Sequence, residues 1–534
     1  MSERVTIRFE PAGRTVKVPV GSTLLEAARA AGLAIDAPCG GAGTCGSCRV
    51  VAAGSLEPPT RTERELLGGA GLSAGKRLAC RARVSGDVTV TLEEAMREMR
   101  VVTSAEQAVA EVEDPALRGV TGIGTVVGAA IDIGTTTVAV QLLDLRTGEV
   151  LATSGDLNAQ RVFGADVLSR VAFASADGGS ELQRLIVSQL DEMLAQALRT
   201  AGLSLERLAE AVIVGNTAMT GLLLGADVSP LGEAPYEGAP TAGARLAGGE
   251  MGLTSTPSLD VGVLPGASAF IGSDVIAGIL ATRLAERVAP TLMIDLGTNG
   301  EIVLAAGGQL LAASTAAGPA LEGASIECGM RAEAGAIERV DLEGDRLALT
   351  TIGGREPLGI CGSGLLDLVA ALLDVGVIDG SGRFVDRVGS PFRDRFTSRD
   401  GVRAFVLDAP AEIVLTQKDV RQVQLAIGAV RTGIDLLLEA AGIGPSAIVN
   451  VVVAGGFGYH VRAGSLVRLG LVPAVWHDRV TFGGNTALAG ARMALVNSRV
   501  RAKASEIAAV IRTIDLAAHA EFQQRFLAAL TFPA

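Results

Sequence analysis

The stretch that decides the fold of most of this chain is residues 125–140, which read TVVGAAIDIGTTTVAV. An apolar segment ends at Asp132, a tight turn with one glycine and three threonines follows, and a second apolar segment begins. Backbone N–H groups and hydroxyls in such a turn can hold phosphate oxygens, while an acid that leaves a buried strand can face Mg²⁺. The stretch therefore predicts a strand, a phosphate-binding turn and a second strand. The predicted phosphate contacts are Gly134, Thr135, Thr136 and Thr137.

A second copy of this pattern, TLMIDLGTNGEIVL, occupies residues 291–304. Two such turns that face each other would form a nucleotide cleft, so the internal repeat carries more weight than either half. An acid at the metal ion or at the attacking water is expected from each copy. The predicted catalytic carboxylates are Asp132, Asp295 and Glu301. The predicted phosphate contacts of the second turn are Gly297, Thr298, Asn299 and Gly300.

A third element, VVVAGGFG at residues 451–458, is a buried strand that runs into a glycine turn. Such a turn lets an adenine or ribose approach the backbone closely. The predicted contacts are Gly455, Gly456 and Gly458. The chain has no P-loop sequence G-x-x-x-x-G-K followed by Ser or Thr. A single Asp-x-Gly-Thr turn is often only a hairpin, but three elements in this order favour ATP binding with Mg²⁺ over structural turns.

Towards the N-terminus, residues 39–48 read CGGAGTCGSC, and a further cysteine stands at position 80. Thiolates are the ligands of iron–sulfur clusters, and four of them complete a [2Fe–2S] site. The interleaved glycines tolerate the curled backbone that brings three thiolates together. A zinc site also uses four cysteines, but it usually pairs two C-x-x-C knuckles, and this chain has one. The predicted cluster ligands are Cys39, Cys45, Cys48 and Cys80.

The segments around these cysteines predict a small sheet domain. Residues 5–9 and 16–20 alternate apolar and polar side chains, which indicates a hairpin, and Pro19 places its strand at a sheet edge. Thr23 and Glu26 form a capping-box pattern at the start of a helix. The charge-rich residues 61–67 are expected to be a solvated surface.

Length and composition set limits on the class of protein. A chain of 534 residues is too long for one ordinary core, and 49% hydrophobic residues indicate a globular protein. The net charge of −12 argues against a nucleic-acid partner. The N-terminal residues lack a signal-peptide core, and no apolar run is long enough to span a membrane, so a cytoplasmic location is expected. The predicted divisions are a ferredoxin-like domain at 1–93, a linker at 94–125, a middle domain at 126–210 and an ATPase domain at 211–534.

The cysteine pattern resembles [2Fe–2S] ferredoxins of the β-grasp fold, and the three later elements resemble the phosphate-1, phosphate-2 and adenosine motifs of the acetate and sugar kinase, Hsp70 and actin (ASKHA) superfamily. The implied fold is an α+β and α/β multidomain protein, with a β-grasp domain, a linker and actin-like, ribonuclease H-like ATPase domains. Further phrases narrow the resemblance to the reductive activators of corrinoid proteins. They are NAQRVFGADVLSR at 158–170, VGNTAM at 214–219, TAAGPALEG at 315–323, ICGSG at 360–364 and GGNTA at 483–487.

This resemblance implies a function. The cluster would give one electron to an inactive Co(II) corrinoid in a partner corrinoid protein or B12-dependent methyltransferase, yielding Co(I), with ATP driving the step. It also implies an upstream electron donor, a reductase or a ferredoxin, and a homodimer is possible. The glycine-rich segment 317–330 is the predicted contact with the partner. The chain departs from the family pattern at Thr220, where the family often has His, and at Ile427, where it often has Lys.

Two other functions stay open at this point. One is an ATP-dependent activator of another radical enzyme, in which Cys328 and Cys361 would bind a second cluster. Buried free cysteines without a ligand role are more common than cluster ligands in such surroundings, which argues against a second cluster. The other is a redox-sensing protein whose nucleotide only stabilises a conformation.

Overall fold

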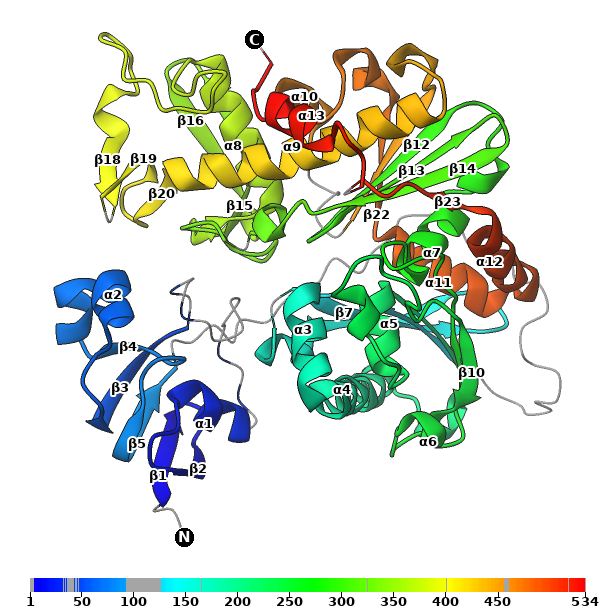
Figure 1. Cartoon of the computed structure of the whole chain (residues 1–534), viewed down its shortest axis with the longest axis horizontal. Helices are drawn as coiled ribbons and strands as arrows, with labels where there is room; N and C mark the ends of the chain where they lie inside the picture. Colours follow the sequence, from blue (N-terminus) through cyan, green and yellow to red (C-terminus); the bar gives the residue numbers. More distant parts are fainter. Residues whose placement is uncertain are drawn as a thin grey trace.

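The computed structural model describes residues 4–31, 33, 35, 43, 46, 48–92, 126–164, 166–323, 325–399, 401–455, 461–516 and 518–533 (Figure 1). The predicted linker 94–125 therefore lies outside the described residues. No helix in the described part of the chain combines the length and the apolar character needed to cross a bilayer.

The N-terminal module is a five-stranded sheet in the order β2-β1-β5-β3-β4. The expected hairpin is present, with β1 antiparallel to β2, and β2 lies at the sheet edge, as Pro19 predicted. The capping box is also present, because Glu26 N–H donates to Thr23 Oγ1 at 3.1 Å and Thr23 N–H donates to Glu26 at 2.8 Å. The elements are β1 (Arg4–Glu10), β2 (Arg14–Pro19), α1 (Leu24–Ala30), β3 (Arg49–Leu56), α2 (Arg61–Ser73), β4 (Lys76–Leu78) and β5 (Val84–Thr91).

The second module is built on a six-stranded sheet in the order β10-β11-β9-β6-β7-β8. Strands β6, β7 and β8 form an antiparallel meander, and β9 lies parallel to β6. Its strands are β6 (Val127–Ile133), β7 (Thr137–Asp144), β8 (Val150–Leu157), β9 (Leu208–Gly215), β10 (Ala244–Ala247) and β11 (Asp260–Val263). Its helices are α3 (Val167–Phe173), α4 (Gly179–Thr200), α5 (Thr217–Leu223), α6 (Gly248–Met251) and α7 (Ser273–Ala281).

A second six-stranded sheet has the order β22-β21-β12-β13-β14-β23. It repeats the first arrangement, because β12, β13 and β14 form an antiparallel meander and β21 lies parallel to β12. Its strands are β12 (Thr291–Leu296), β13 (Gly300–Ala306), β14 (Gln309–Thr315), β21 (Asn450–Ala454), β22 (Val480–Gly484) and β23 (Arg512–Thr513). The internal repeat predicted from the two Asp-x-Gly-Thr turns thus extends to five strands of each sheet, whereas β10 and β23 lie at opposite edges.

Further elements pack around this second sheet. Two three-stranded sheets have the orders β16-β15-β17 and β18-β19-β20. Their strands are β15 (Ala336–Glu343), β16 (Arg346–Thr351), β17 (Gly359–Ile360), β18 (Phe396–Arg399), β19 (Val402–Asp408) and β20 (Ile413–Thr416). The helices are α8 (Gly362–Asp374), α9 (Gln417–Ala440), α10 (Ala463–Arg468), α11 (Thr486–Val496), α12 (Ser498–Val510) and α13 (Phe522–Ala529).

The expected boundary between residues 210 and 211 is wrong, because it falls inside β9. The apolar run 211–214 is not the start of a domain but the middle of a strand, which pairs with both β6 and β11 in the first sheet. The second sheet begins at Thr291, after α7. The division between the two halves therefore lies between Ala281 and Thr291.

Helices α7 and α11 lie between the two sheets and join the halves (Figure 1). One buried cluster contains Val212 of the first sheet, Met293 of the second, Ile276 of α7 and Leu488 of α11. The two helices approach so closely that a Cβ at Gly490 would lie 2.0 Å from the Ala277 carbonyl oxygen. This contact fixes the N-terminal ends of both helices relative to the two turns.

Candidate functional site

Two of the four predicted cluster ligands lie within the described residues, and they lie together. The Sγ atoms of Cys48 and Cys80 are 3.3 Å apart, and both side chains are buried. The backbone explains this placement, because Arg49 pairs with Leu78 across the ladder of β3 and β4, with one cysteine just before β3 and the other just after β4. Cys39 and Cys45 lie outside the described residues. The two thiols that are described fit the donor type an iron–sulfur cluster requires.

A buried ion pair holds the Cys80 segment in place. Glu63 is fully buried, accepts a hydrogen bond from Arg77 Nε at 2.8 Å, and accepts another from Leu78 N–H at 3.2 Å. The expectation that residues 61–67 form only a solvated surface is therefore wrong for Glu63. The error arises because Arg77, its partner, stands outside the charged run.

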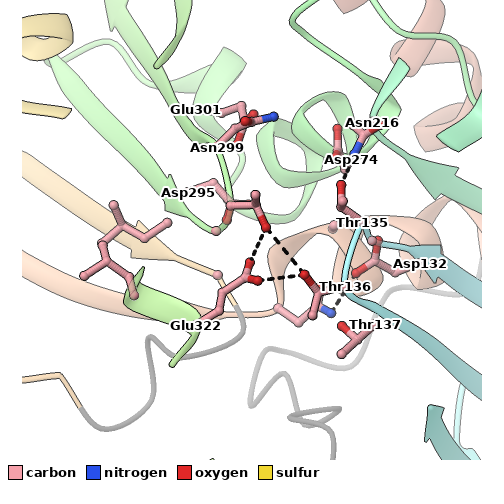
Figure 2. A pocket seen from close by; sticks show the side chains of 18 of the residues that line it. Asp132, Thr135, Thr136, Thr137, Asn216, Asp274, Asp295, Asn299, Glu301 and Glu322 are labelled. Atoms are coloured by element: carbon pink, nitrogen blue, oxygen red, sulfur yellow. Dashed lines mark hydrogen bonds between the residues drawn. The ribbon is translucent and has the colours of Figure 1, made fainter. Parts of the chain in front are cut away.

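The two predicted phosphate turns line one cavity of about 220 Å³ (Figure 2). They come from equivalent places, the β6–β7 connection and the β12–β13 connection, and the Oγ1 atoms of Thr136 and Thr298 lie 3.5 Å apart. The predicted residues that line the cavity are Asp132, Gly134, Thr135, Thr136, Thr137, Asp295, Gly297, Thr298, Asn299, Glu301 and Gly455.

The remaining predicted residues are placed differently. Gly300 does not line the cavity. Its missing side chain serves packing, because a Cβ there would lie 2.7 Å from Thr315 Oγ1. Gly455 has φ +110°, and a Cβ would lie 2.2 Å from the Leu296 carbonyl oxygen, so glycine is needed where the third element meets the second turn. Gly456 and Gly458 lie outside the described residues.

Several carboxyl groups line the cavity, and burial raises their pKa values. Burial raises the pKa of Asp132 to about 6, although a hydrogen bond from Asn485 opposes the shift. Burial, together with the neighbouring Asp274 and Asp132 carboxylates, raises the pKa of Asp295 to about 7. Burial and then the charges of Asp274 and Asp295 raise the pKa of Glu301 well above its usual range. Each carboxyl disfavours ionisation of the next, so the cluster favours a cation or retained protons.

Asp274 is a member of this cluster that the sequence patterns missed. It stands in the first turn of α7 and lines the cavity beside Asp132 (Figure 2). Burial, followed by the charge of Asp132, raises the pKa of Asp274 to about 7. No repeat marks this position in the sequence, and only the packing of α7 between the sheets brings it to the turns.

Glu322 links the two halves across the cavity. Its carboxylate accepts a hydrogen bond from Thr136 Oγ1 at 2.7 Å and another from Thr298 Oγ1 at 3.0 Å (Figure 2). The sequence placed Glu322 in the segment 317–330, which was predicted to contact a partner, but its side chain lies in the cavity. Two hydroxyls from different halves therefore converge on one anionic group, as phosphate binding requires.

Two copies of the tetrapeptide Gly-Asn-Thr-Ala support the first turn. Asn216 caps α5 with its side-chain oxygen and donates from Nδ2 to Thr135 Oγ1 at 2.9 Å. Asn485 caps α11 in the same way and donates from Nδ2 to Asp132 Oδ2 at 2.9 Å. The repeat of this tetrapeptide was a signal that could have assigned both asparagines to the site.

Side chains of the segment 158–170 form hydrogen bonds to the backbone of the same turn. Asn158 Nδ2 donates to the Gly134 carbonyl oxygen at 2.8 Å. Arg170 is fully buried and donates to the carbonyl oxygens of Thr135 and Gly164. A buried guanidinium beneath the turn orients its carbonyls away from the cavity, which leaves N–H groups and hydroxyls for an anion.

The charges of the residues that line the cavity suit a nucleotide that binds together with a divalent cation. Among the described lining residues Arg331 is the one cation, whereas the acids include Asp132, Asp274, Asp295 and Glu322. No set of three or more His, Cys, Asp or Glu side chains among the described residues is already arranged around a metal position. Carboxylate oxygens are nevertheless the donors that Mg²⁺ prefers, and it usually binds one or two of them together with phosphate oxygens. Asp132 would hold it here, with phosphate oxygens as its other ligands.

The remaining residues singled out in the sequence lie apart from the described lining. Cys361 is buried and donates from Sγ to the Ile337 carbonyl oxygen at 3.2 Å, and burial raises the pKa of its thiol. Burial raises the pKa of Cys328 as well. The departures Thr220 and Ile427 are buried positions of α5 and α9. None of the four lines the cavity.

Three family profiles match the chain in sequence order. Residues 7–85 match the 2Fe-2S iron-sulfur cluster binding domain, residues 127–287 match the RACo middle region, and residues 289–534 match the C-terminal domain of RACo, the ASKHA domain. The division after residue 287 agrees with the division between the two sheets.

Individual proteins match over most of the chain. The chain is 35% identical over 413 residues to the corrinoid activation enzyme RamQ of Eubacterium limosum, covering 75% of this chain and 69% of the relative. It is 28% identical over 405 residues to the Co(II) methylated amine-specific corrinoid protein reductase of Methanosarcina barkeri. This match covers 70% of this chain and 71% of the relative. A solved structure titled reductive activator for corrinoid, iron-sulfur protein shares 29% identity, covers 99% of this chain and 98% of that chain, and has a TM-score of 0.72.

Proposed function

The chain belongs to the family of reductive activators of corrinoid proteins, and we propose on this premise that it reduces the inactive Co(II) corrinoid of a partner protein to Co(I) in an ATP-dependent reaction. The relatives named above are a corrinoid activation enzyme and a corrinoid protein reductase. The reaction adds one electron to cobalt and consumes one from the reduced activator. The partner is a corrinoid protein or a B12-dependent methyltransferase.

The observation that carries the proposal is the convergence of the two turns on one acidic cavity in a chain that also has a [2Fe–2S] domain. Thr136 and Thr298 come from different halves of the molecule and share one carboxylate, Glu322. A phosphate chain bound between them would replace that carboxylate and draw the two turns together. Because α7 and α11 join the halves, closure of the turns would change the relation of the two sheets.

The bound groups supply the electron and the driving force: a [2Fe–2S] cluster on Cys39, Cys45, Cys48 and Cys80 carries one electron, and ATP with Mg²⁺ supplies free energy on hydrolysis. The protein must convert that free energy into a conformational preference. About 5 kcal/mol shifts a two-state population almost completely, and for one electron it offsets roughly 0.2 V. Closure of the cleft is a suitable source of such a preference.

Separate roles are proposed for the acids of the cleft. Asp132 holds the cation that accompanies the phosphates, and Asp295 or Glu301 accepts the proton of the attacking water. A pKa of about 7 suits Asp295 for that task, because a general base works best when its pKa is near the working pH. The hydroxyls of both turns and Asn299 would orient the phosphates.

The proposal extends to the setting of the reaction. A reductase or a ferredoxin supplies the electron, and the protein works in the cytoplasm, where a reducing environment keeps the ligand cysteines as thiols. A homodimer stays a prediction from the resemblance.

The test is anaerobic reduction of a Co(II) corrinoid protein by the chemically reduced full-length chain. With ATP and Mg²⁺ the Co(II) absorbance is expected to disappear as Co(I) forms, and without ATP most of it is expected to remain. The Cys80→Ser variant, which removes a predicted cluster ligand but leaves the cleft intact, is expected to keep ATP binding and lose the reduction. Reduction that proceeds equally with and without ATP would refute the proposal.

A further inference from the structure

A second cavity, of about 640 Å³, lies at the far ends of the elements that form the cleft. Helix α7 contributes Asp274 from its first turn to the cleft and residues 279–281 from its last turn to this cavity. Helix α11 contributes Ala487 to the cleft and Ala489, Arg492 and Met493 to the second cavity. The two cavities share no lining residue in the described part of the chain. The second cavity is therefore a separate site on the same pair of helices.

The charge of this cavity is opposite to that of the cleft. Its described lining includes four cations and one acid, Glu286, although the chain as a whole carries a net charge of −12. Lys503 Nζ lies 2.5 Å from Glu286, and Arg283 and Arg287 also interact electrostatically with this acid, so one carboxylate faces several cations and the lining stays positive. The other three cations are Arg283, Arg287 and Arg492.

Arg492 is the most unusual of the three. Its Nε atom is buried and has no hydrogen-bond partner among the described residues. Burial lowers the pKa of Arg492, and no carboxylate opposes the shift. A guanidinium desolvated in this way costs free energy unless an anion or an acceptor pairs with it. Arg287 is partly engaged, since its Nη2 donates to the Thr282 carbonyl oxygen at 3.4 Å.

The rest of the lining suits an organic molecule better than a bare ion. Phe482 lines the cavity with 38% of its surface exposed, so an apolar ring face is available beside the cations. Asn450 and Thr481, from neighbouring strands β21 and β22, add polar side chains. Arginine binds carboxylate and phosphate groups, and ligand pockets combine apolar surface with a few placed polar groups, so this lining suits an organic anion.

We propose that this cavity binds a small organic polyanion, whose phosphate or carboxylate groups pair with Arg283 and Arg492 and whose apolar part packs on Phe482. The site is independent of the nucleotide cleft in its residues. Its ligand contacts α7 and α11, the two helices that position Asp274 and Asn485. If the ligand binds one arrangement of the two halves more tightly, its binding changes the affinity of the cleft for nucleotide.

The test uses the full-length, cluster-loaded protein with its cleft saturated by a non-hydrolysable ATP analogue and Mg²⁺. Calorimetric titrations with citrate and with pyrophosphate form two arms, which separate a carboxylate ligand from a phosphate ligand. At least one is expected to bind with a Kd below about 1 mM, and Arg492→Gln is expected to weaken it by about tenfold or more, the effect of losing a charge-assisted hydrogen bond. Arg283→Gln is expected to weaken it as well.

The matched control is Arg199→Gln, which removes one exposed arginine from α4 and is expected to leave the titration unchanged. Arg492→Lys keeps the charge and provides a second variant if Arg492→Gln does not fold. Three results would each overturn the proposal. Neither anion binds at about 10 mM, the Arg283 and Arg492 variants bind as well as the Arg199 variant, or the ATP analogue competes with the anion for its site.

Discussion

The two halves of the nucleotide cleft have the same backbone plan and different electrostatics. In each half a strand runs into an Asp-x-Gly-Thr turn and returns antiparallel, and on its other side the first strand pairs with a parallel strand, β9 or β21. In the first half Asp132 receives a hydrogen bond from Asn485, and burial raises its pKa to about 6. In the second half Asp295 pairs across the ladder with Glu301, and burial and neighbouring acids raise its pKa to about 7.

This difference suggests a division of labour. The first turn offers three hydroxyls and an acid that a hydrogen bond keeps ionised, which suits phosphate and cation binding. The second turn brings Asp295, whose pKa of about 7 leaves it partly ionised at neutral pH, and this suits acceptance of a proton. The two halves thus share one backbone arrangement, and a few side chains give them different chemical roles.

The largest expected effect concerns the paired aspartates. Asp295→Asn is expected to lower the rate of ATP hydrolysis by about 10²–10⁴-fold, because it removes a proton acceptor with a pKa near the working pH. Asp132→Asn, at the equivalent place in the first half, is expected to weaken Mg·ATP binding more than the rate. Steady-state hydrolysis of both variants at saturating ATP checks this, with the cluster absorbance as the control for folding. Equal losses of rate in the two variants would show that the halves are not divided in this way.

The two capping asparagines give the next comparison. Asn216→Ala and Asn485→Ala each remove a helix N-cap, which costs about 1 kcal/mol. Asn485→Ala also leaves the Asp132 carboxylate without its hydrogen-bond donor. The free energy of unfolding is therefore expected to fall by about 1–2 kcal/mol more in this variant than in Asn216→Ala at pH 8. Urea unfolding of the nucleotide-free protein measures both. The excess is expected to shrink below pH 6, where Asp132 is protonated, and an excess that is independent of pH would contradict the assignment.

The third prediction concerns pH. The pKa of Asp132 is about 6, and those of Asp274 and Asp295 are about 7, so these acids take up protons as the pH falls from 8 to 6. Protons then compete with the cation, and the affinity for Mg·ATP is expected to fall by up to about tenfold per pH unit for each proton displaced. Calorimetric Kd values at pH 6, 7 and 8 check this, and Asp295→Asn should flatten the dependence. An affinity that rises on acidification would contradict it.

The smallest expected effect concerns the two threonines that share Glu322. Thr136→Val and Thr298→Val each remove one hydroxyl from the anion position and are expected to weaken Mg·ATP binding by about three- to tenfold. The Thr136 contact is the shorter, 2.7 Å against 3.0 Å, so the larger loss is expected in the first half. The serine variants keep the hydroxyl and are expected to bind like the unaltered chain. Wild-type affinity in both valine variants would remove the threonines from the phosphate site.

The sequence was informative where a local pattern decides a local structure. The Asp-x-Gly-Thr turns, the edge strand at Pro19 and the capping box at Thr23 all follow from short-range backbone preferences. The repeat of the turns also predicted that Asp132 and Asp295 would share one cavity, since equivalent strand ends in paired halves face the same space.

The sequence was silent where long-range packing decides. Asp274 reaches the cleft only because α7 lies between the two sheets, and Glu63 of α2 is buried only because Arg77 of β4 pairs with it. The boundary at residue 210 was misplaced because an apolar run does not show whether it begins a domain or fills the middle of a sheet. Glu322 was assigned to a partner surface because a glycine-rich segment does not show which way its acids point.

The most direct test of the central claim, that the cleft drives electron delivery to cobalt, compares the unaltered chain with Asp295→Asn under anaerobic conditions. Both proteins should carry the same reduced cluster signal in electron paramagnetic resonance, since the substitution lies in the cleft. With Mg·ATP and a Co(II) corrinoid protein, the unaltered chain is expected to convert Co(II) to Co(I), and the variant is expected to leave the Co(II) absorbance largely in place. If the variant reduces the corrinoid as fast as the unaltered chain does, nucleotide hydrolysis is not coupled to the electron, and the account is wrong.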